Sequence, residues 1–183
     1  NECHLEEYQA GEYRVWRNQE DLNVGIAYHL QIITPNGDEI LSTPDVMPAV
    51  GEIKTPVFEE SSNYNGVYNV DEPGIQFYID IEGDESTSKY YMFDLDATYE
   101  HHADYDREWY YDGQVHHIYP PDSSLFFCWT TERVPEILLL STENLSENKF
   151  KDFKMHFVSY RADYLTYGYS LLIKQTGLSR EAY

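Results

Sequence analysis

Histidines and aspartates between residues 100 and 122 supply the side chains best suited to metal chemistry. Imidazoles bind transition metals and carboxylates add oxygen ligands, but the spacing here follows no known zinc motif. Adjacent side chains on a strand point to opposite faces, so neither histidine pair can chelate one ion on a regular strand. Two interpretations stay open: a calcium- or metal-dependent binding domain or hydrolase, or histidines that are solvated or hydrogen-bonded. The residues concerned are His101, His102, Asp104, Asp106, His116 and His117.

The sequence gives less support to a calcium-binding loop or a catalytic motif than to the metal site described above. Counted from Asp104, an EF-hand needs Gly at the sixth position and Glu at the twelfth, where this chain has Trp109 and Val115. Carboxylates are so numerous that no pair stands out as a glycosidase acid and base. The chain has neither a G-x-S-x-G nucleophile elbow nor a glycine-rich phosphate loop before a helix. The sequence therefore predicts no catalytic residues, no enzyme and no cofactor.

Aromatic side chains fill the same stretch and are the residues that we expect to bind a ligand. They could present ring faces to a sugar, a peptide or another protein, as recognition loops do. The competing interpretation is that they pack onto the domain's own sheet. We expect the central three to lie exposed on one edge. The candidate ligand-binding residues are Tyr105, Trp109, Tyr110, Tyr111 and Tyr119.

Composition limits the classes of partner. The 183 residues include 12 Lys and Arg against 33 Asp and Glu, a formal charge of −21, which repels nucleic acid. Hydrophobic residues make up 42% of the chain, which favours a folded domain over disorder. No apolar stretch approaches the roughly 20 residues of a membrane-spanning helix. Cys3 and Cys128 lack the spacing of a metal or redox site; we expect Cys128 to be buried, with a disulfide to Cys3 left open.

Alternating apolar residues predict short antiparallel strands that form a sandwich. Residues 28–33 and 39–42 flank a Pro-Asn-Gly turn and are typical of a hairpin. Residues 74–81 form a strongly β-prone strand, for which we expect residues 89–99 to be the hairpin partner. In that partner Tyr91, Phe93, Leu95, Ala97 and Tyr99 alternate with more polar residues, so we expect them to form its inward-packing face. Residues 100–122 are expected to form a long loop.

Prolines between residues 44 and 56 indicate a crossover or domain boundary. We therefore expect a partial N-terminal β domain over residues 1–47 and the main antiparallel sandwich over residues 48–183. At the other end, Ser179 is a candidate N-cap, with Glu181 in the first turn, for the start of a C-terminal helix.

The order of motifs along the chain resembles that of the Bacteroidota lipoprotein-like family catalogued as domain of unknown function 4249. The most specific part is residues 170–183, which are similar to the family's S-L-x-V-x-Q-x-x-L-S-x-E-A-Y signature. The other matching segments are Gly11-Glu12-Tyr13, Tyr28 to Ile32, Pro35-Asn36-Gly37, Ser42, Met47 to Val50, Gly74 to Ile81, Tyr90-Tyr91 and Cys128-Trp129.

This resemblance implies an exported outer-membrane lipoprotein, periplasmic or on the cell surface, with immunoglobulin-like architecture in both predicted domains. It implies a partial or truncated family member whose lipid anchor lies upstream, so that Cys3 is not the lipidated cysteine. It also implies a TonB-dependent transporter, or another outer-membrane protein, as the partner, and it brings no catalytic residues. Our leading hypothesis is a non-enzymatic accessory or binding protein. The alternatives are the metal-dependent domain above and a purely structural spacer.

Overall fold

A computed structural model of the chain describes residues 3–15 and 22–183. The chain divides into two compact units, residues 1–49 and residues 50–183, which are described separately below. Nearly all regular structure in both units is antiparallel β-strand, as the alternating apolar pattern predicts. None of the described residues forms a helix that is long and apolar enough to cross a membrane.

The described part of unit 1 (residues 3–15 and 22–49) contains three short antiparallel strand pairs. The predicted hairpin around Pro35-Asn36-Gly37 is confirmed, because Gln31 pairs with Leu41 and Gly37 adopts the positive φ of 87° that the turn requires. The pairs are β1 (Glu6–Gln9) with β2 (Glu12–Arg14), β3 (Ala27–Tyr28) with β6 (Asp45–Val46), and β4 (Gln31–Ile33) with β5 (Glu39–Leu41).

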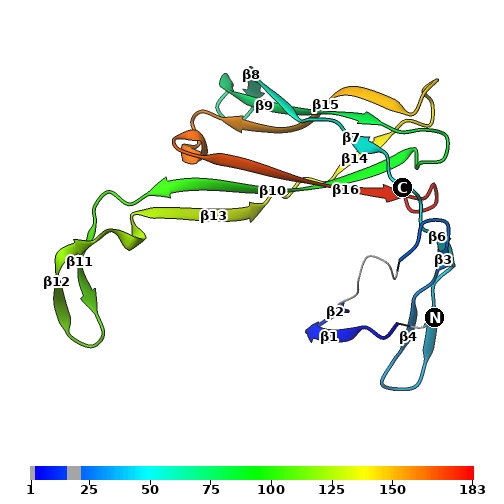
Figure 1. The fold of residues 1–183 in the computed structure, drawn as a ribbon, viewed down its shortest axis with the longest axis horizontal. Helices are drawn as coiled ribbons and strands as arrows, with labels where there is room; N and C mark the ends of the chain where they lie inside the picture. The colour runs from blue at the N-terminus through cyan, green and yellow to red at the C-terminus, as the bar shows by residue number, and fades with distance from the viewer. Residues whose placement is uncertain (1–2, 16–21) are drawn as a thin grey trace. The chain divides into compact units, whose positions relative to one another are not determined.

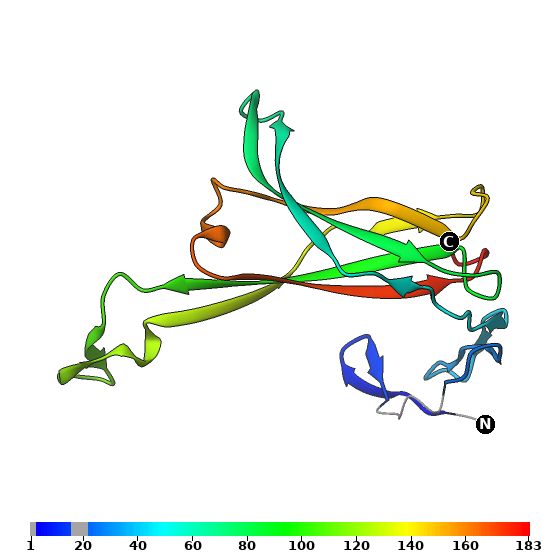
Figure 2. The same cartoon turned by 45° about the horizontal axis from the view of Figure 1, so that its top comes forward.

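Unit 2 (residues 50–183) is an antiparallel β-sandwich of two sheets, which lie one above the other in Figure 1. In the first sheet the central strand β9 (Val70–Glu82) has β15 (Lys149–Ser159) on one side. On its other side β8 (Val57–Asn65) pairs with residues 70–78 of β9, and β7 (Glu52–Ile53) pairs with residues 81–82. In the second sheet the central strand β10 (Tyr90–His102) has β16 (Tyr169–Leu178) on one side. On its other side β14 (Leu138–Ser141) pairs with residues 90–93 of β10, and β13 (Phe127–Arg133) pairs with residues 96–102, beside the end of β10 that extends past β16 (Figure 2).

The core lies between the two sheets. The predicted inward face of residues 89–99 is confirmed, because the side chains of Tyr91, Phe93 and Leu95 are completely buried. They meet residues of the other sheet: the rings of Phe93 and Phe153 have centroids 5.6 Å apart. The remaining buried core residues are Ile79, Ile81, Val134, Leu140 and Met155.

The expected hairpin between residues 74–81 and 89–99 is wrong. These residues belong to β9 and β10, which are consecutive in the chain but are the central strands of different sheets. The loop between them arches from one sheet to the other, and the buried side chain of Asn148 holds it. Its Nδ2 donates to the carbonyl oxygens of Ser88 at 2.9 Å and Asp84 at 3.2 Å. Both strands have an apolar face and two neighbours, so alternation alone could not assign them to separate sheets.

Two backbone features fit β15 closely against β9. A Cβ atom at Gly74 would lie 2.2 Å from the carbonyl oxygen of Val158, so only glycine allows this approach. Between Phe150 and Phe153 the register shifts, and Asp152 adopts a positive φ of 54° there. The Asp152 N–H donates to Asp80 Oδ1 at 2.9 Å. This is the geometry of a β-bulge, in which an extra residue is accommodated on one strand.

The expected C-terminal helix is not present in the described residues. Strand β16 continues to Leu178, and residues 180–182 form a turn. The predicted capping contact does form, since the Ala182 N–H donates to Ser179 Oγ at 3.1 Å. The turn brings the ring of Tyr183 to 5.1 Å from that of Tyr90. Ser179 therefore stabilises a turn after the strand.

Candidate functional site

Strands β10 and β13 continue past the sandwich as a two-stranded arm. The pairing of β10 with β16 ends at Tyr99, whereas its pairing with β13 continues to His102. Beyond the arm lies a hairpin of β11 (Arg107–Tyr111) and β12 (Val115–Asp122), which pair only with each other among the described strands (Figure 1). The stretch expected to be a loop is thus mostly strand. The prolines of β12 are tolerated because neither side of this hairpin has a further strand to bond.

The five predicted ligand-binding residues all lie on this hairpin or beside it and are exposed. The exposed fractions are 56% for Trp109, 44% for Tyr110 and 74% for Tyr111. Tyr105 and Tyr119 are exposed at 85% and 87%. Packing onto the domain's own sheet, the competing interpretation, is therefore wrong for these side chains. Their role in ligand binding stays a prediction.

The hairpin presents rings on both of its faces. Trp109 lies opposite His117 in the register, and their ring centroids are 4.5 Å apart. On the other face Tyr110 stacks on His116, with centroids 4.7 Å apart and an angle of 12° between the rings. Tyr111 shares the face of Trp109, because side chains two apart on a strand point the same way. Each face therefore offers an aromatic surface supported by its cross-strand partner.

An ion pair closes the base of the hairpin. Arg107 and Asp122 are opposite each other in the register, and their side chains form a salt bridge. Asp122 Oδ1 also accepts from the backbone N–H of Ser124 at 2.9 Å. The hydrogen bonds from Ser124, followed by the bond from Arg107, lower the pKa of Asp122 to about 2. Asp122 is therefore ionised at neutral pH, which maintains both contacts.

The structure does not bring the six candidate metal-binding residues together. Nowhere in residues 3–15 and 22–183 do three or more His, Cys, Asp or Glu side chains form a group that could hold a metal ion. His102 Nε2 instead lies 2.7 Å from Glu100 Oε1. The His102 ring also stacks on the ring of Tyr167, with the two ring centroids 3.6 Å apart. His116 Nε2 lies 2.9 Å from Asp112 Oδ1. For these two histidines the hydrogen-bonded interpretation is correct.

An aromatic cluster on the outer face of the arm was missed by the sequence reasoning. Phe127 and Trp129 are exposed at 60% and 59%, and Tyr167 at 55%. The alternation of residues 127 and 129 could have indicated a shared face, but Tyr167 comes from a distant loop. Cys128 points to the other face and is half-buried, not buried as expected. Cys3 and Cys128 are not joined by a disulfide, the bond that was left open in the sequence.

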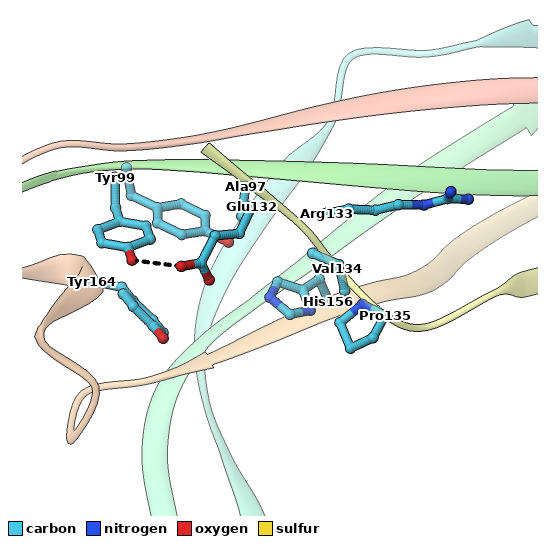
Figure 3. Close-up of a pocket in the computed structure, with 9 residues that line it drawn as sticks. Ala97, Tyr99, Glu132, Arg133, Val134, Pro135, His156 and Tyr164 are labelled. Carbon is cyan, nitrogen blue, oxygen red and sulfur yellow. Dashed lines mark hydrogen bonds between the residues drawn. The ribbon is translucent and has the colours of Figure 1, made fainter. Parts of the chain in front are cut away.

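A cavity of about 170 Å³ lies at the base of the arm and was also missed (Figure 3). Its polar walls are Tyr99 of β10, Glu132 and Arg133 of β13, His156 of β15 and Tyr169 of β16. Tyr164, in the short 3-10 segment Asp163–Leu165, also lines it. These residues come from five separate elements and belong to no motif, so no sequence signal groups them.

Comparison with known proteins finds one family. The model of the family described as "Domain of unknown function (DUF4249)" matches residues 1–183. No curated protein and no solved structure matches the chain.

Proposed function

We propose, on the premise that the chain belongs to the DUF4249 family, that it is a non-enzymatic accessory protein that contacts a TonB-dependent transporter. The proposal includes export and attachment to the outer membrane through a lipid anchor upstream of Cys3. The partner and the location rest on the family resemblance. The observation that carries the binding role is the set of five exposed aromatic side chains on and beside the β11–β12 hairpin.

Exposed aromatic side chains support binding because of what their burial contributes. Trp and Tyr supply a large, stiff contact area, and they dominate the binding energy of many interfaces. Trp109 is exposed at 56% although it contacts His117, so most of its area is available to a partner. The hairpin adds nothing to the sandwich core, and no residue of its two strands is buried. Selection for stability alone does not account for rings in this position.

Co-purification of the transporter tests this proposal. The tagged full-length protein is extracted from outer membranes in mild detergent, and the retained proteins are quantified by mass spectrometry. We expect a TonB-dependent transporter to be enriched. The double variant Trp109→Ala/Tyr111→Ala should reduce its recovery at least about tenfold, because hot-spot truncations cost about 2 kcal/mol or more.

A matched variant controls for the loss of any exposed ring. Tyr68→Ala removes a side chain that is exposed at 66%, close to the 74% of Tyr111, but at the β8–β9 turn. Its transporter recovery should equal that of the wild type. Failure of the wild type to retain any transporter would contradict the proposal. An equal loss in Tyr68→Ala would show that the hairpin is not the contact.

A further inference from the structure

We infer that the cavity at the base of the arm binds a small organic cation with an apolar body, such as a quaternary ammonium group. The cavity lies between the two sheets, since His156 belongs to the first sheet and the tyrosines of β10 and β16 to the second. It is separate from the hairpin rings. The inference therefore does not depend on the proposed transporter contact.

Three tyrosine rings form the aromatic part of the cavity. Tyr99 and Tyr169 are directly opposite each other on β10 and β16, so their side chains share the inward face of the sheet. The ring of Tyr164 approaches from the side, with its centroid 4.4 Å from that of Tyr99 (Figure 3). Cations are attracted to the faces of such rings, and aromatic cages of this kind recognise quaternary ammonium ligands.

One carboxylate supplies negative charge at the same place. Glu132 is paired opposite Ala97, which puts its side chain on the face of the rings, and its Oε1 accepts from the Tyr99 hydroxyl at 3.1 Å. The guanidinium of Arg133 points away in Figure 3 and forms a salt bridge with Asp94. Arg133 therefore does not neutralise Glu132. The net charge of −21 further favours the approach of a cation.

Apart from Arg133, which also lines the cavity, the basic and phenolic groups of its walls are neutral at neutral pH and do not oppose a cationic ligand. Burial lowers the pKa of His156, against the smaller opposing effect of Glu136, so this ring is neutral at neutral pH. Burial raises the pKa of Tyr169 to about 12. Burial and then the hydrogen bond to Glu132 raise the pKa of Tyr99. The remaining walls include Val134 and Pro135, which are apolar.

Size and an unpaired hydroxyl narrow the choice of ligand. The volume of about 170 Å³ is close to that of the cavity of about 150 Å³ that binds benzene, so one compact head group fits and a chain of sugars does not. The buried hydroxyl of Tyr169 has no hydrogen-bond partner among the described residues. A buried polar group without a partner is costly, and a hydroxyl carried by the ligand beside its ammonium group, as in choline, would supply a partner that the quaternary nitrogen itself cannot.

The test compares two molecules of the same shape. Choline carries a quaternary ammonium, and 3,3-dimethylbutan-1-ol is its neutral isostere. Calorimetric titration of the purified chain should show choline binding at least about tenfold more tightly, because a desolvated cation–π contact contributes about 2 kcal/mol. Equal affinities would overturn the inference in favour of a purely apolar pocket. Absence of choline binding up to tens of millimolar would also overturn it.

Two pairs of variants identify the residues responsible. Tyr164→Leu should weaken choline binding about tenfold, whereas Tyr164→Phe keeps the ring and should bind like the wild type. Tyr164 is 39% exposed, so neither change disturbs the core. Glu132→Gln should weaken binding, and the control Glu85→Gln removes the same charge from the exposed β9–β10 loop, at the opposite end of β10. Wild-type affinity in Tyr164→Leu, or an equal loss in both Glu variants, would refute the site.

Discussion

At the scale of single residues, Asn148 links the two sheets of unit 2. It follows β14 in the chain, yet its amide bonds the loop between the central strands β9 and β10. Its Oδ1 accepts from Thr142 Oγ1 at 2.5 Å and from the Tyr91 hydroxyl at 3.0 Å. Its Nδ2 donates to two carbonyl oxygens and to Thr87 Oγ1 at 2.9 Å. One side chain thus forms hydrogen bonds with the loop between β9 and β10, with Tyr91 of β10 and with Thr142 after β14.

We expect Asn148→Asp to lower the free energy of unfolding by about 3 kcal/mol or more, because a carboxylate at this buried position would face carbonyl oxygens and lose the amide donors. Urea denaturation at neutral pH measures the effect. The exposed Asn144→Asp makes the same chemical change four residues earlier and should stay within about 0.5 kcal/mol of the wild type. Similar losses in both variants would contradict the role of Asn148.

His156 makes the stability of unit 2 depend on pH. Burial lowers its pKa in the folded state below the ordinary value of 6.5, so the unfolded chain binds the proton more tightly. Its contribution to stability is therefore complete above about pH 6.5 and is lost as the pH falls towards the lower, folded-state pKa. We expect the difference in unfolding free energy between wild type and His156→Gln to shrink from pH 8 to pH 5. Urea denaturation at a series of pH values measures it.

An exposed histidine provides the comparison for this pH effect. His101 lies on β10, in the other sheet, and is exposed. His101→Gln is the matched variant, because it makes the same side-chain change at an exposed position. If both variants follow the same pH dependence, burial of His156 is not the cause.

At the scale of elements, the β11–β12 hairpin is expected to be dispensable for folding. Ala103 and Phe126 form the last hydrogen-bonded pair before it, with the Ala103 N–H donating to the Phe126 oxygen at 2.9 Å. Replacing residues 104–125 with Asn-Gly should close the arm with a two-residue turn. Because none of the removed side chains whose burial the structure describes is completely buried, unfolding free energy should change by less than about 1 kcal/mol. Thermal and urea denaturation measure it, and a loss of several kcal/mol would show that the hairpin supports the sandwich.

The alternation of apolar and polar residues predicts which segments form strands much better than it predicts how those strands pair. Tyr91, Phe93 and Leu95 are buried as expected, because side-chain direction follows from the period of two. Assignment of β9 and β10 to different sheets depends on the arch held by Asn148, a residue about 60 positions away from that loop. The exposure of Trp109 was expected from its polar surroundings. The cavity was not, because Tyr99, Glu132 and Tyr169 meet only through strand pairing.

At the scale of the whole molecule, the two units differ in the core they contain. All the buried hydrophobic residues belong to unit 2, and none of the described residues of unit 1 is buried. A segment without a core has too little burial to offset the conformational entropy of folding. We expect residues 50–183 alone to unfold cooperatively, and residues 1–49 alone to show no cooperative transition. Circular dichroism during heating measures both, and failure of residues 50–183 to fold would contradict this division.

The assignment of β9 and β10 to different sheets also determines when the chain can fold. β9 and β10 do not pair with each other, and one edge of each pairs with a strand from the last third of the sequence. Tyr90 of β10 pairs with Leu178 of β16, and Ile81 of β9 pairs with Phe150 of β15. Folding dominated by such distant pairings is expected to take milliseconds to seconds. During that interval two strongly apolar strands have open edges that invite pairing with other molecules. The charge of −21 then acts before any ligand is present, because mutual repulsion keeps unfinished chains apart.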